Sequence, residues 1–224
     1  MKLHNWIVTI GSVITLATAT SSFAQMKEFT GASVYGSTGY NTWSTEFSGA
    51  KDTTYAYSLD TATSAGLPLF VGVDYTWAVS DVNSLGLSFE RNFLKSAGGS
   101  SNVYSGGKYL GGSSTVVDDS YQISVVPGFL IDKNSLAYGK FGYYSAGLTS
   151  SNTSTSNSFT PTGYSLGAGV KTLFNIPSSG NNFYVFGESN YRIANSVGQT
   201  FSGGGTLDIK LGGMNVLVGL GMHF

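Results

Sequence analysis

LFVGVDYTWAV, at residues 69–79, is the stretch of sequence that decides the fold class. Large apolar side chains occupy every second position from Leu69 to Val79, and most positions between them hold small or polar residues such as Asp74 and Thr76. Period-2 alternation of this kind is typical of a β-strand with two different faces. The stretch therefore predicts a strand whose only charge, Asp74, lies on the face opposite the large apolar side chains.

The same alternation recurs along the chain and predicts eight strands in all. Within the strand cores the charged residues fall on the face opposite the large apolar residues, and no stretch shows a convincing helical period. An all-β protein is therefore expected. The predicted strands cover approximately residues 30–41, 69–79, 85–90, 121–129, 137–143, 164–171, 183–193 and 214–224.

The composition indicates which environment the apolar faces meet. Charged residues make up 10% of the chain, where about 25% is usual for a soluble protein. A soluble barrel turns its charged face to water, whereas eight successive faces poor in charge suit hydrocarbon. No apolar run reaches the length of a membrane helix, so the remaining solution is a closed barrel. The sequence predicts an eight-stranded antiparallel transmembrane up-and-down β-barrel.

Aromatic residues near the strand ends fit the interfacial belts of such a barrel. One belt is expected near the loops and the other near the turns. The expected members are Tyr40, Tyr121, Tyr164 and Tyr191 on one rim, and Trp77, Phe129, Phe183 and Phe224 on the other.

The connections between the predicted strands alternate between short and long. Residues 80–84, 131–135 and 175–182 form short breaks, whereas the other four connections are long and rich in Gly, Ser, Thr and Asn. Long loops outside and short turns with both termini in the periplasm are usual for these barrels. We expect flexible extracellular loops, including the Gly-rich segments 97–99, 106–107 and 203–205. The long connections span residues 42–68, 94–120, 148–161 and 194–209.

The N-terminal residues predict export. Lys2 precedes an apolar run from Trp6 to Ala17, and small residues lead to Ala24, which has the order of a secretory signal peptide. We expect residues 1–24 to be the signal peptide and residues 25–224 to form one outer-membrane β-barrel domain in a Gram-negative cell envelope. The absence of cysteine is compatible with an exported protein that needs no disulfide.

Three stretches resemble a known family. They are VVPGFLIDKNSLAYGKFGYYSAG at residues 125–147, GYSLGAGVKTLF at residues 163–174 and LVGLGMHF at residues 217–224. The chain resembles the small proteobacterial outer-membrane β-barrel domain proteins and is similar to the membrane domain of outer membrane protein A. The resemblance implies an outer-membrane location, and a terminal signal for the assembly machinery at Leu220, Met222 and Phe224.

Two-domain members of this family carry a peptidoglycan-binding domain after the barrel. This sequence has none after its eighth predicted strand, so the resemblance does not imply a role in tethering the cell wall.

Charged residues on the inner face are expected to meet inside the barrel. An eight-stranded barrel leaves an interior that side chains can fill, so acids and bases there should pair. The pattern favours a structural ion network in the lumen over a gated ion path. The expected members are Asp74, Glu90, Lys140, Glu188 and Arg192.

Two cations fall on the outward face. Arg91 and Lys210 lie at the loop-side ends of their predicted strands, where they could hold lipopolysaccharide phosphates. The alternative is that both side chains extend into solvated headgroups without a specific partner, and this reading is favoured.

Several function classes find no support in the sequence. The net charge of −1 provides no basic field for nucleic acid, and the absence of cysteine excludes thiolate metal sites. No Gly-rich segment has the pattern of a phosphate-binding loop, so no cofactor is expected. His223 lies one residue from the C-terminus with no nearby acid to orient it, so we expect no catalytic residues and no enzyme activity.

Three functions remain open, and the sequence does not indicate an oligomeric state. The first, which is favoured, is a structural role in envelope integrity with at most slight porin-like permeability. The second is a surface-binding protein, an adhesin or phage receptor, that uses loop tyrosines. The third is a carrier of small apolar molecules through a lumen lined by aromatic residues. The loop tyrosines are Tyr55, Tyr57, Tyr104 and Tyr109, and the inward aromatic residues are Phe70, Tyr138, Tyr144, Tyr184 and Phe186.

Overall fold

The computed structural model describes residues 26–51, 57–105, 107–151, 156–175, 182–200 and 206–224. The expected signal peptide and its cleavage site lie outside these residues, as do Tyr55 and the Gly-rich segment 203–205. Within the described residues, no helix has the length and apolar character needed to cross a membrane.

In the described part of the chain, one short 3-10 helix precedes thirteen β-strands. The elements are η1 (Met26–Phe29), β1 (Gly31–Lys51), β2 (Tyr57–Leu59), β3 (Ala62–Gly66), β4 (Leu69–Ala78), β5 (Asn83–Asn92), β6 (Ser96–Ser105), β7 (Lys108–Asp132), β8 (Ser135–Ser151), β9 (Ser156–Phe159), β10 (Thr162–Asn175), β11 (Asn182–Ala194), β12 (Val197–Thr200) and β13 (Thr206–His223).

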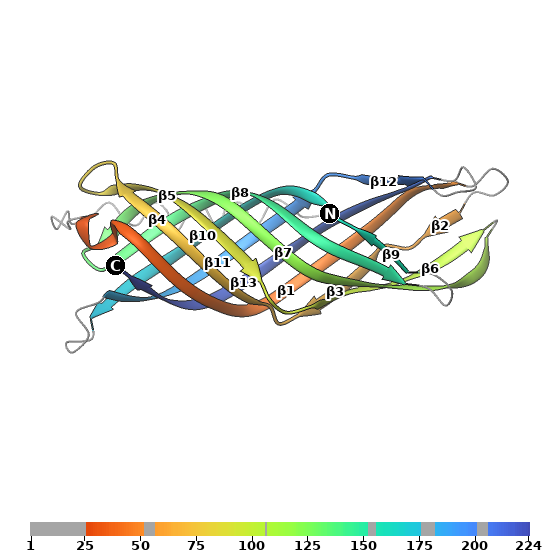
Figure 1. Ribbon diagram of the computed structural model, residues 1–224, viewed down its shortest axis with the longest axis horizontal. Helices are drawn as coiled ribbons and strands as arrows, with labels where there is room; N and C mark the ends of the chain where they lie inside the picture. The colour runs from red at the N-terminus through yellow and green to blue at the C-terminus, as the bar shows by residue number, and fades with distance from the viewer. Residues whose placement is uncertain (1–25, 52–56, 106, 152–155, 176–181, 201–205) are drawn as a thin grey trace, which may run out of the picture.

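Eight strands pair in a closed antiparallel ring (Figure 1). Going round the ring, the order is β1, β4, β5, β7, β8, β10, β11 and β13, and β13 pairs again with β1. Apart from the closing pair of β13 and β1, each ring strand pairs with the next ring strand along the chain, and each of the eight predicted strands corresponds to one ring member. The chain forms the predicted eight-stranded up-and-down transmembrane β-barrel.

The two faces of the barrel wall are those that the alternation predicts. On β13, Val216 and Val218 are 49% and 61% exposed on the outer face, whereas Leu217 between them is 1% exposed and points inward. Large apolar side chains form an outer girdle of this kind on every ring strand, as expected for a surface that meets hydrocarbon.

Aromatic side chains mark both ends of the girdle. Phe183 is partly buried and stacks on Phe174, with their ring centroids 6.1 Å apart. Tyr143 joins the loop-side tyrosines and contacts Tyr164 edge to face at 5.9 Å. The other expected belt residues are all exposed: Tyr40, Tyr121 and Tyr191 near the loops, and Trp77, Phe129 and Phe224 near the turns.

The described parts of the long connections consist largely of strands, not of the flexible loops that their composition predicts. β1 runs on to Lys51, β7 begins at Lys108, β8 extends to Ser151 and β13 begins at Thr206, so these strands continue well beyond the girdle. Residues 97–99, predicted as a flexible Gly-rich segment, lie within β6. The prediction failed because Ser, Thr and Gly side chains hide the alternation, while backbone hydrogen bonds to neighbouring strands still form the ladder.

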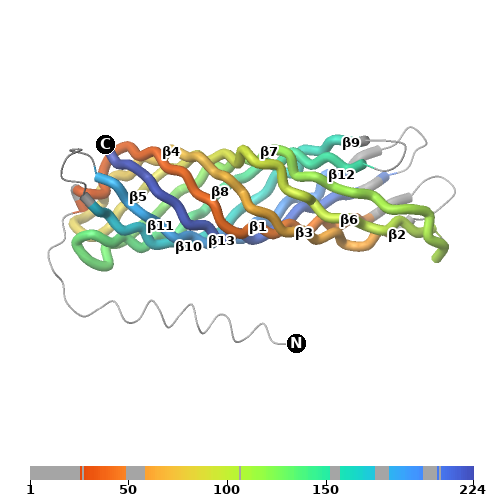
Figure 2. Tube along the Cα trace, turned by 90° about the horizontal axis from the view of Figure 1, so that it is seen from below, coloured from red at the N-terminus to blue at the C-terminus, as the bar shows by residue number. Residues whose placement is uncertain are grey.

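Beyond the girdle, the barrel wall no longer forms a continuous ring of paired strands, because the pairing between β10 and β11 has no counterpart between β9 and β12 in the described residues. β9 and β12 continue the lines of β10 and β11, which pair with each other, but β9 pairs with β8 and β12 pairs with β13. The result is a strand-built extension at one end of the molecule, with the C-terminus at the other end (Figure 2). We call these ends the loop end and the turn end.

The polarity of the wall inverts in this extension. Its outer face carries exposed charges such as Glu46, Asp208 and Lys210, whereas its inner face holds a cluster of apolar side chains beside small polar ones such as Thr45. This arrangement matches a water-soluble β-structure, because the apolar side chains now face one another. The inner cluster, called the loop-end cluster, consists of Trp43, Val117, Tyr144, Ala146, Leu148, Phe159, Ala194, Ile209 and Leu211.

Candidate functional site

The middle of the lumen holds a buried ion layer centred on Lys140 of β8. Its Nζ lies 2.7 Å from Glu90 Oε2 on β5 and 2.9 Å from Glu188 Oε1 on β11. These three side chains are 3%, 1% and 5% exposed. They meet because each occupies an inward position on its strand, so three strands distant in sequence place their charges at one depth.

Neighbouring polar groups add hydrogen bonds to both acids, although Glu90 Oε1 has no hydrogen-bond partner among the described residues. The Tyr35 hydroxyl donates to Glu90 Oε2 at 3.2 Å, and the Tyr138 hydroxyl donates to Glu188 Oε2 at 3.0 Å. Asn190 Nδ2 donates to Glu188 Oε1 at 2.7 Å. Hydrogen bonds of this kind offset part of the cost of burying an ion pair. The layer therefore holds five of the eight ring strands together: β1, β5, β8 and β11 through these groups, and β7 through Gln122 described below.

Arg192 of β11 extends the layer toward the loop end. Its Nη2 lies 3.8 Å from Glu90 Oε1, and its Nε donates to Gln122 Oε1 at 3.3 Å. Its guanidinium also lies over aromatic rings, an arrangement that stabilises a desolvated cation. The Cζ atom of Arg192 lies 5.4 Å from the ring centroid of Trp43, 5.2 Å from that of Phe70 and 6.0 Å from that of Tyr144.

Asp74 is placed differently from the other four expected members. In the described part of the chain its carboxylate makes no ion pair and accepts long hydrogen bonds of 3.4 Å from Tyr184 and Thr76. A further cation, Lys171 of β10, is buried nearby, with its Nζ 5.3 Å from the centroid of the Tyr184 ring and 5.8 Å from that of Phe29. The structure thus brings four of the five predicted residues into ion-pair contact and adds Lys171.

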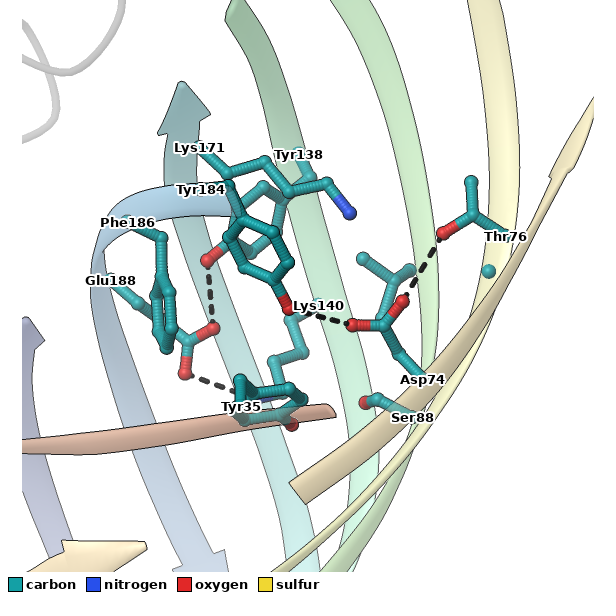
Figure 3. A pocket seen from close by; sticks show the side chains of 12 residues that line it. Tyr35, Asp74, Thr76, Ser88, Tyr138, Lys140, Lys171, Tyr184, Phe186 and Glu188 are labelled. Carbon is teal, nitrogen blue, oxygen red and sulfur yellow. Dashed lines mark hydrogen bonds and ion pairs between the residues drawn. The ribbon is translucent and has the colours of Figure 1, made fainter. Parts of the chain in front are cut away.

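A cavity of about 40 Å³ lies beside the ion layer and Lys171, and its other side is the wall formed by β4, β5 and β7 (Figure 3). Bulky side chains from the opposite wall reach across the lumen, whereas this wall carries small inward residues such as Thr76, Gly86 and Ser88. The volume suffices for one or two water molecules, which need polar partners of this kind. The other lining residues are Tyr35, Asp74, Val126, Tyr138, Lys140, Lys171, Tyr184, Phe186 and Glu188.

Apolar side chains fill the lumen on both sides of the ion layer. On the loop side lies the loop-end cluster, with Trp43, Ile209 and Leu211 each at most 1% exposed. On the turn side lies a second group, called the turn-end cluster. It consists of Met26, Phe29, Tyr35, Leu136, Leu173, Tyr184 and Phe186. The five inward aromatic residues predicted from the sequence all lie in the lumen and help to fill it.

The predicted rim cation Arg91 has an intramolecular partner. Its Nη2 and Nε donate to the two oxygens of Asp119 at 2.7 and 3.2 Å, and its guanidinium lies 5.4 Å from the centroid of the Phe93 ring. Hydrogen bonding to Asp119 raises the pKa of Arg91 above its ordinary value. Lys210 is exposed and lies opposite Glu46 in the pairing of β13 with β1.

A second polar pair occurs beside Arg91. Lys95 Nζ lies 2.9 Å from Asp118 Oδ1, and Thr149 Oγ1 donates to Asp118 Oδ2 at 2.5 Å. The Thr149 hydrogen bond, followed by Lys95, lowers the pKa of the Asp118 carboxyl below its ordinary value. These contacts fix the position at which β7 and β8 emerge from the girdle.

The C-terminal strand presents the expected outward pattern. Leu220 and Phe224 are 63% and 64% exposed, whereas Met222 is partly buried. His223 points inward, with Nδ1 2.9 Å from Ser33 Oγ and Nε2 2.7 Å from the carbonyl oxygen of Thr30. A carbonyl oxygen only accepts, so Nε2 carries a proton. His223 thus links β13 to β1 at the seam that closes the ring, and the structure shows no carboxylate bonded to it within the described residues.

Several residues of the site were not predicted. Tyr35, Trp43 and Lys171 contribute to the ion layer or its surroundings, and η1 enters the turn-end cluster. Tyr35 has the same inward parity as Ser33 and Ser37, which the alternation could have revealed. Among the described residues, no group of three or more His, Asp or Glu could hold a metal ion.

Comparison with known proteins gives distant likenesses. No protein-family model and no curated protein matches the chain. It is similar in structure to Ail, the attachment invasion locus protein of Yersinia pestis, with 16% identity, coverage of 84% of this chain and 99% of Ail, and a TM-score of 0.40. It is also similar to the outer membrane protein OprG from Pseudomonas aeruginosa, with 12% identity, coverage of 87% and 96%, and a TM-score of 0.47. A third similar structure is the outer membrane protease OmpT from Escherichia coli, with 11% identity, coverage of 92% and 100%, and a TM-score of 0.46.

Proposed function

We propose that the protein is an integral outer-membrane β-barrel with a structural role in the envelope. The proposed orientation places the loop end outside the cell and the turn end, with both termini, in the periplasm. The girdle and its two aromatic belts support membrane insertion, and the long strand hairpins at one end support this orientation. The predicted signal peptide is consistent with the same location.

The observation that carries the structural role is the filled lumen. A permeating ion would have to separate Lys140 from two carboxylates and also pass the loop-end cluster, in which Trp43 and Leu211 are at most 1% exposed. Separating a buried ion pair is strongly unfavourable because it leaves uncompensated charge in a low dielectric. Any porin-like permeability is therefore expected to be slight and infrequent.

Planar-bilayer conductance of the refolded protein tests this proposal. The wild-type protein should be nearly silent, with barrel formation verified by a heat-modifiability gel. A variant with Glu90→Ser, Lys140→Ser and Glu188→Ser empties the centre of the ion layer, leaves Arg192 with Gln122 and its aromatic neighbours, and should show more frequent openings. The matched control, Arg91→Ser with Asp119→Ser, removes an exposed ion pair outside the lumen and should stay silent.

Large, reproducible openings of the wild-type barrel would overturn the structural role and make the protein a channel. If the triple variant folds and remains as silent as the wild type, the ion layer is not the barrier. The loop-end cluster would then have to be emptied in the same assay, for instance at Trp43 and Leu211.

A second candidate function, surface binding as an adhesin or phage receptor, is favoured by the hairpin of β6 and β7. Tyr109 and Leu110 are 57% and 54% exposed at its tip, and Tyr104 contacts Tyr109 edge to face at 5.9 Å. Exposed tyrosines among Ser, Gly and Asn are typical of binding loops. Tyr109→Ser with Leu110→Ser should abolish adherence of expressing cells to cultured epithelial cells and leave the barrel intact. Unchanged adherence and phage adsorption would remove this candidate.

The third candidate, a carrier of small apolar molecules, is disfavoured because charged groups of the ion layer interrupt the aromatic lining of the lumen. An apolar solute would have to displace Lys140 and its two carboxylates, which is costly in free energy.

We also propose two contacts with the envelope. Lys210, and Arg91 when it leaves Asp119, would meet lipopolysaccharide phosphates, and unchanged lipopolysaccharide retention after replacement of both cations by Gln would exclude this contact.

The exposed side chains of Leu220 and Phe224, together with Met222, would be recognised by the assembly machinery. Deletion of Phe224 should then lower the amount of barrel in the outer membrane without preventing refolding in detergent.

A further inference from the structure

The chain segment before β1 enters the barrel at its turn end. Met26 and Phe29 of η1 are 2% and 1% exposed, so both side chains lie inside the mouth rather than along its rim. They belong to the turn-end cluster, and three of its other members, Tyr35, Tyr184 and Phe186, also line the cavity. η1 therefore packs on the walls of the cavity from the turn side.

The chain turns sharply between η1 and β1, and Gly31 at this point allows the turn. Gly31 has a φ of +128°, a conformation that side-chain-bearing residues rarely adopt. A Cβ at this position would also lie 2.6 Å from the carbonyl oxygen of Phe224. Glycine thus allows the chain to leave the barrel wall and turn inward beside the seam between β1 and β13.

Among the described residues, only a few polar contacts hold η1 against the barrel. The backbone N–H of Met26 donates to the carbonyl oxygen of Asp81 at 3.2 Å, and Asn182 Nδ2 donates to Glu28 Oε2 at 3.1 Å. A single turn fixed by such contacts and by two apolar side chains is a unit that can open without unfolding the ring.

Groups beneath η1 have unmet hydrogen-bonding capacity. Within the described residues, the ammonium of Lys171 has aromatic rings as neighbours and no hydrogen-bond or ion-pair partner, although the residue is 8% exposed. Ser88 Oγ, which lines the cavity from β5, is likewise without a partner. Asp74 faces Lys171 across the cavity with two long hydrogen bonds (Figure 3). Such groups require water, so the cavity is a hydrated chamber rather than part of the dry core.

We propose that η1 is a removable stopper, and that the chamber beneath it admits small water-soluble molecules from the turn side only when η1 leaves the mouth. Phe29 is the principal seal because its ring covers the side chain of Lys171. The ion layer closes the chamber on its loop side, so a molecule that enters the chamber does not cross the barrel. The proposal goes beyond the structural role proposed above. That role requires only that the ion layer close the barrel, whether or not η1 also closes its turn-side mouth.

Cysteine reactivity tests the stopper, because the chain contains no cysteine of its own. Ser88→Cys places a thiol in the chamber, and Thr45→Cys places one among the fully buried residues of the loop side. The rate of modification by 2-sulfonatoethyl methanethiosulfonate is followed by mass spectrometry on barrels verified by heat modifiability. Phe29→Ala should raise the rate at position 88 about tenfold, the factor expected when one large buried side chain no longer holds the closed state.

Two comparisons make this test specific. The rate at position 45 should not change with Phe29→Ala, because the ion layer and loop-end cluster separate it from the chamber. Phe174→Ala removes the same ring from the outer girdle at the turn end, where Phe174 is 42% exposed, and should leave the rate at position 88 unchanged. If Phe29→Ala does not fold, Met26→Ala serves in its place, with a smaller increase expected.

Three results would overturn the proposal. They are an unchanged rate at position 88 in a folded Phe29→Ala or Met26→Ala barrel, an equal increase at position 45, and an equal increase with Phe174→Ala. The first would show that η1 is not the barrier, and the other two would show general loosening of the barrel. None of these results depends on conductance, so the stopper and the structural role can fail separately.

Discussion

Lys140→Met is expected to destabilise the barrel by about 3 kcal/mol, toward the lower end of the roughly 3–5 kcal/mol found when one partner of a buried ion pair is removed. The substitution keeps a long unbranched side chain and removes the cation that lies 2.7 Å from Glu90 and 2.9 Å from Glu188. The three side chains are 1–5% exposed, so solvent screening does not reduce the effect. Arg192, 3.8 Å from Glu90, compensates one carboxylate in part, which is why the lower end of the range applies.

The measurement is urea-induced unfolding of the refolded barrel in lipid, with the free energy of unfolding obtained by linear extrapolation. A neutral variant that combines Lys140→Met with Glu188→Gln should recover at least half of the loss, because the remaining carboxylate, Glu90, still faces Arg192 at 3.8 Å. The reasoning is refuted if Lys140→Met lies within about 1 kcal/mol of the wild type, or if the neutral variant is no more stable than the single one.

Three further predictions concern the girdle, the lumen wall and the loop side, and each is read from the same unfolding assay. Val218→Arg, at a girdle position that is 61% exposed, should cost about 2–4 kcal/mol in lipid, and a negligible cost would show that this face does not meet hydrocarbon. Gly219→Ala should cost about 1–3 kcal/mol, because its Cβ would lie 2.6 Å from a backbone oxygen of β1, whereas Gly187→Ala, with no atom within 4 Å, should be nearly neutral; equal effects would contradict the packing argument. Asp118 has a lowered pKa, chiefly through Thr149, so its ionised form stabilises the fold above the carboxyl's ordinary pKa of about 4, and this contribution is lost as the pH falls through the folded-state pKa. Asp118→Asn should therefore be less stable than the wild type at pH 7 and approach it at low pH, and a constant difference down to low pH would contradict this account.

The membrane part of the fold was predictable because hydrocarbon imposes a strict pattern on the wall. Residues such as Val218 and Leu220 must face lipid, and charges such as Lys140 and Glu188 must then face inward. Period-2 alternation carries this information directly in the sequence. The eight ring strands, their faces and the inward position of the charged residues follow from it.

The loop side was predicted poorly because the constraint is weaker there. Residues 97–99 read as a flexible Gly-rich segment, but they lie in β6, whose ladder to β7 depends on backbone hydrogen bonds rather than on side chains. The apolar inner residues of this region, such as Trp43 and Leu211, are spaced along strands whose outer positions are Ser, Thr, Gly or charged residues. Composition there resembles a loop although the backbone is extended and paired.

The sequence by itself determined that the chain forms an eight-stranded transmembrane barrel with its charges in the lumen, because lipid on one side of the wall fixes the parity of every strand. Tertiary structure alone decided which charges meet: Lys140 with two glutamates, Arg192 among aromatic rings, and Asp74 across a cavity from Lys171. Parity places a side chain inside the barrel, but its depth and its partners depend on the register between strands. That register is set by hydrogen bonding and packing round the closed ring, which no single strand contains.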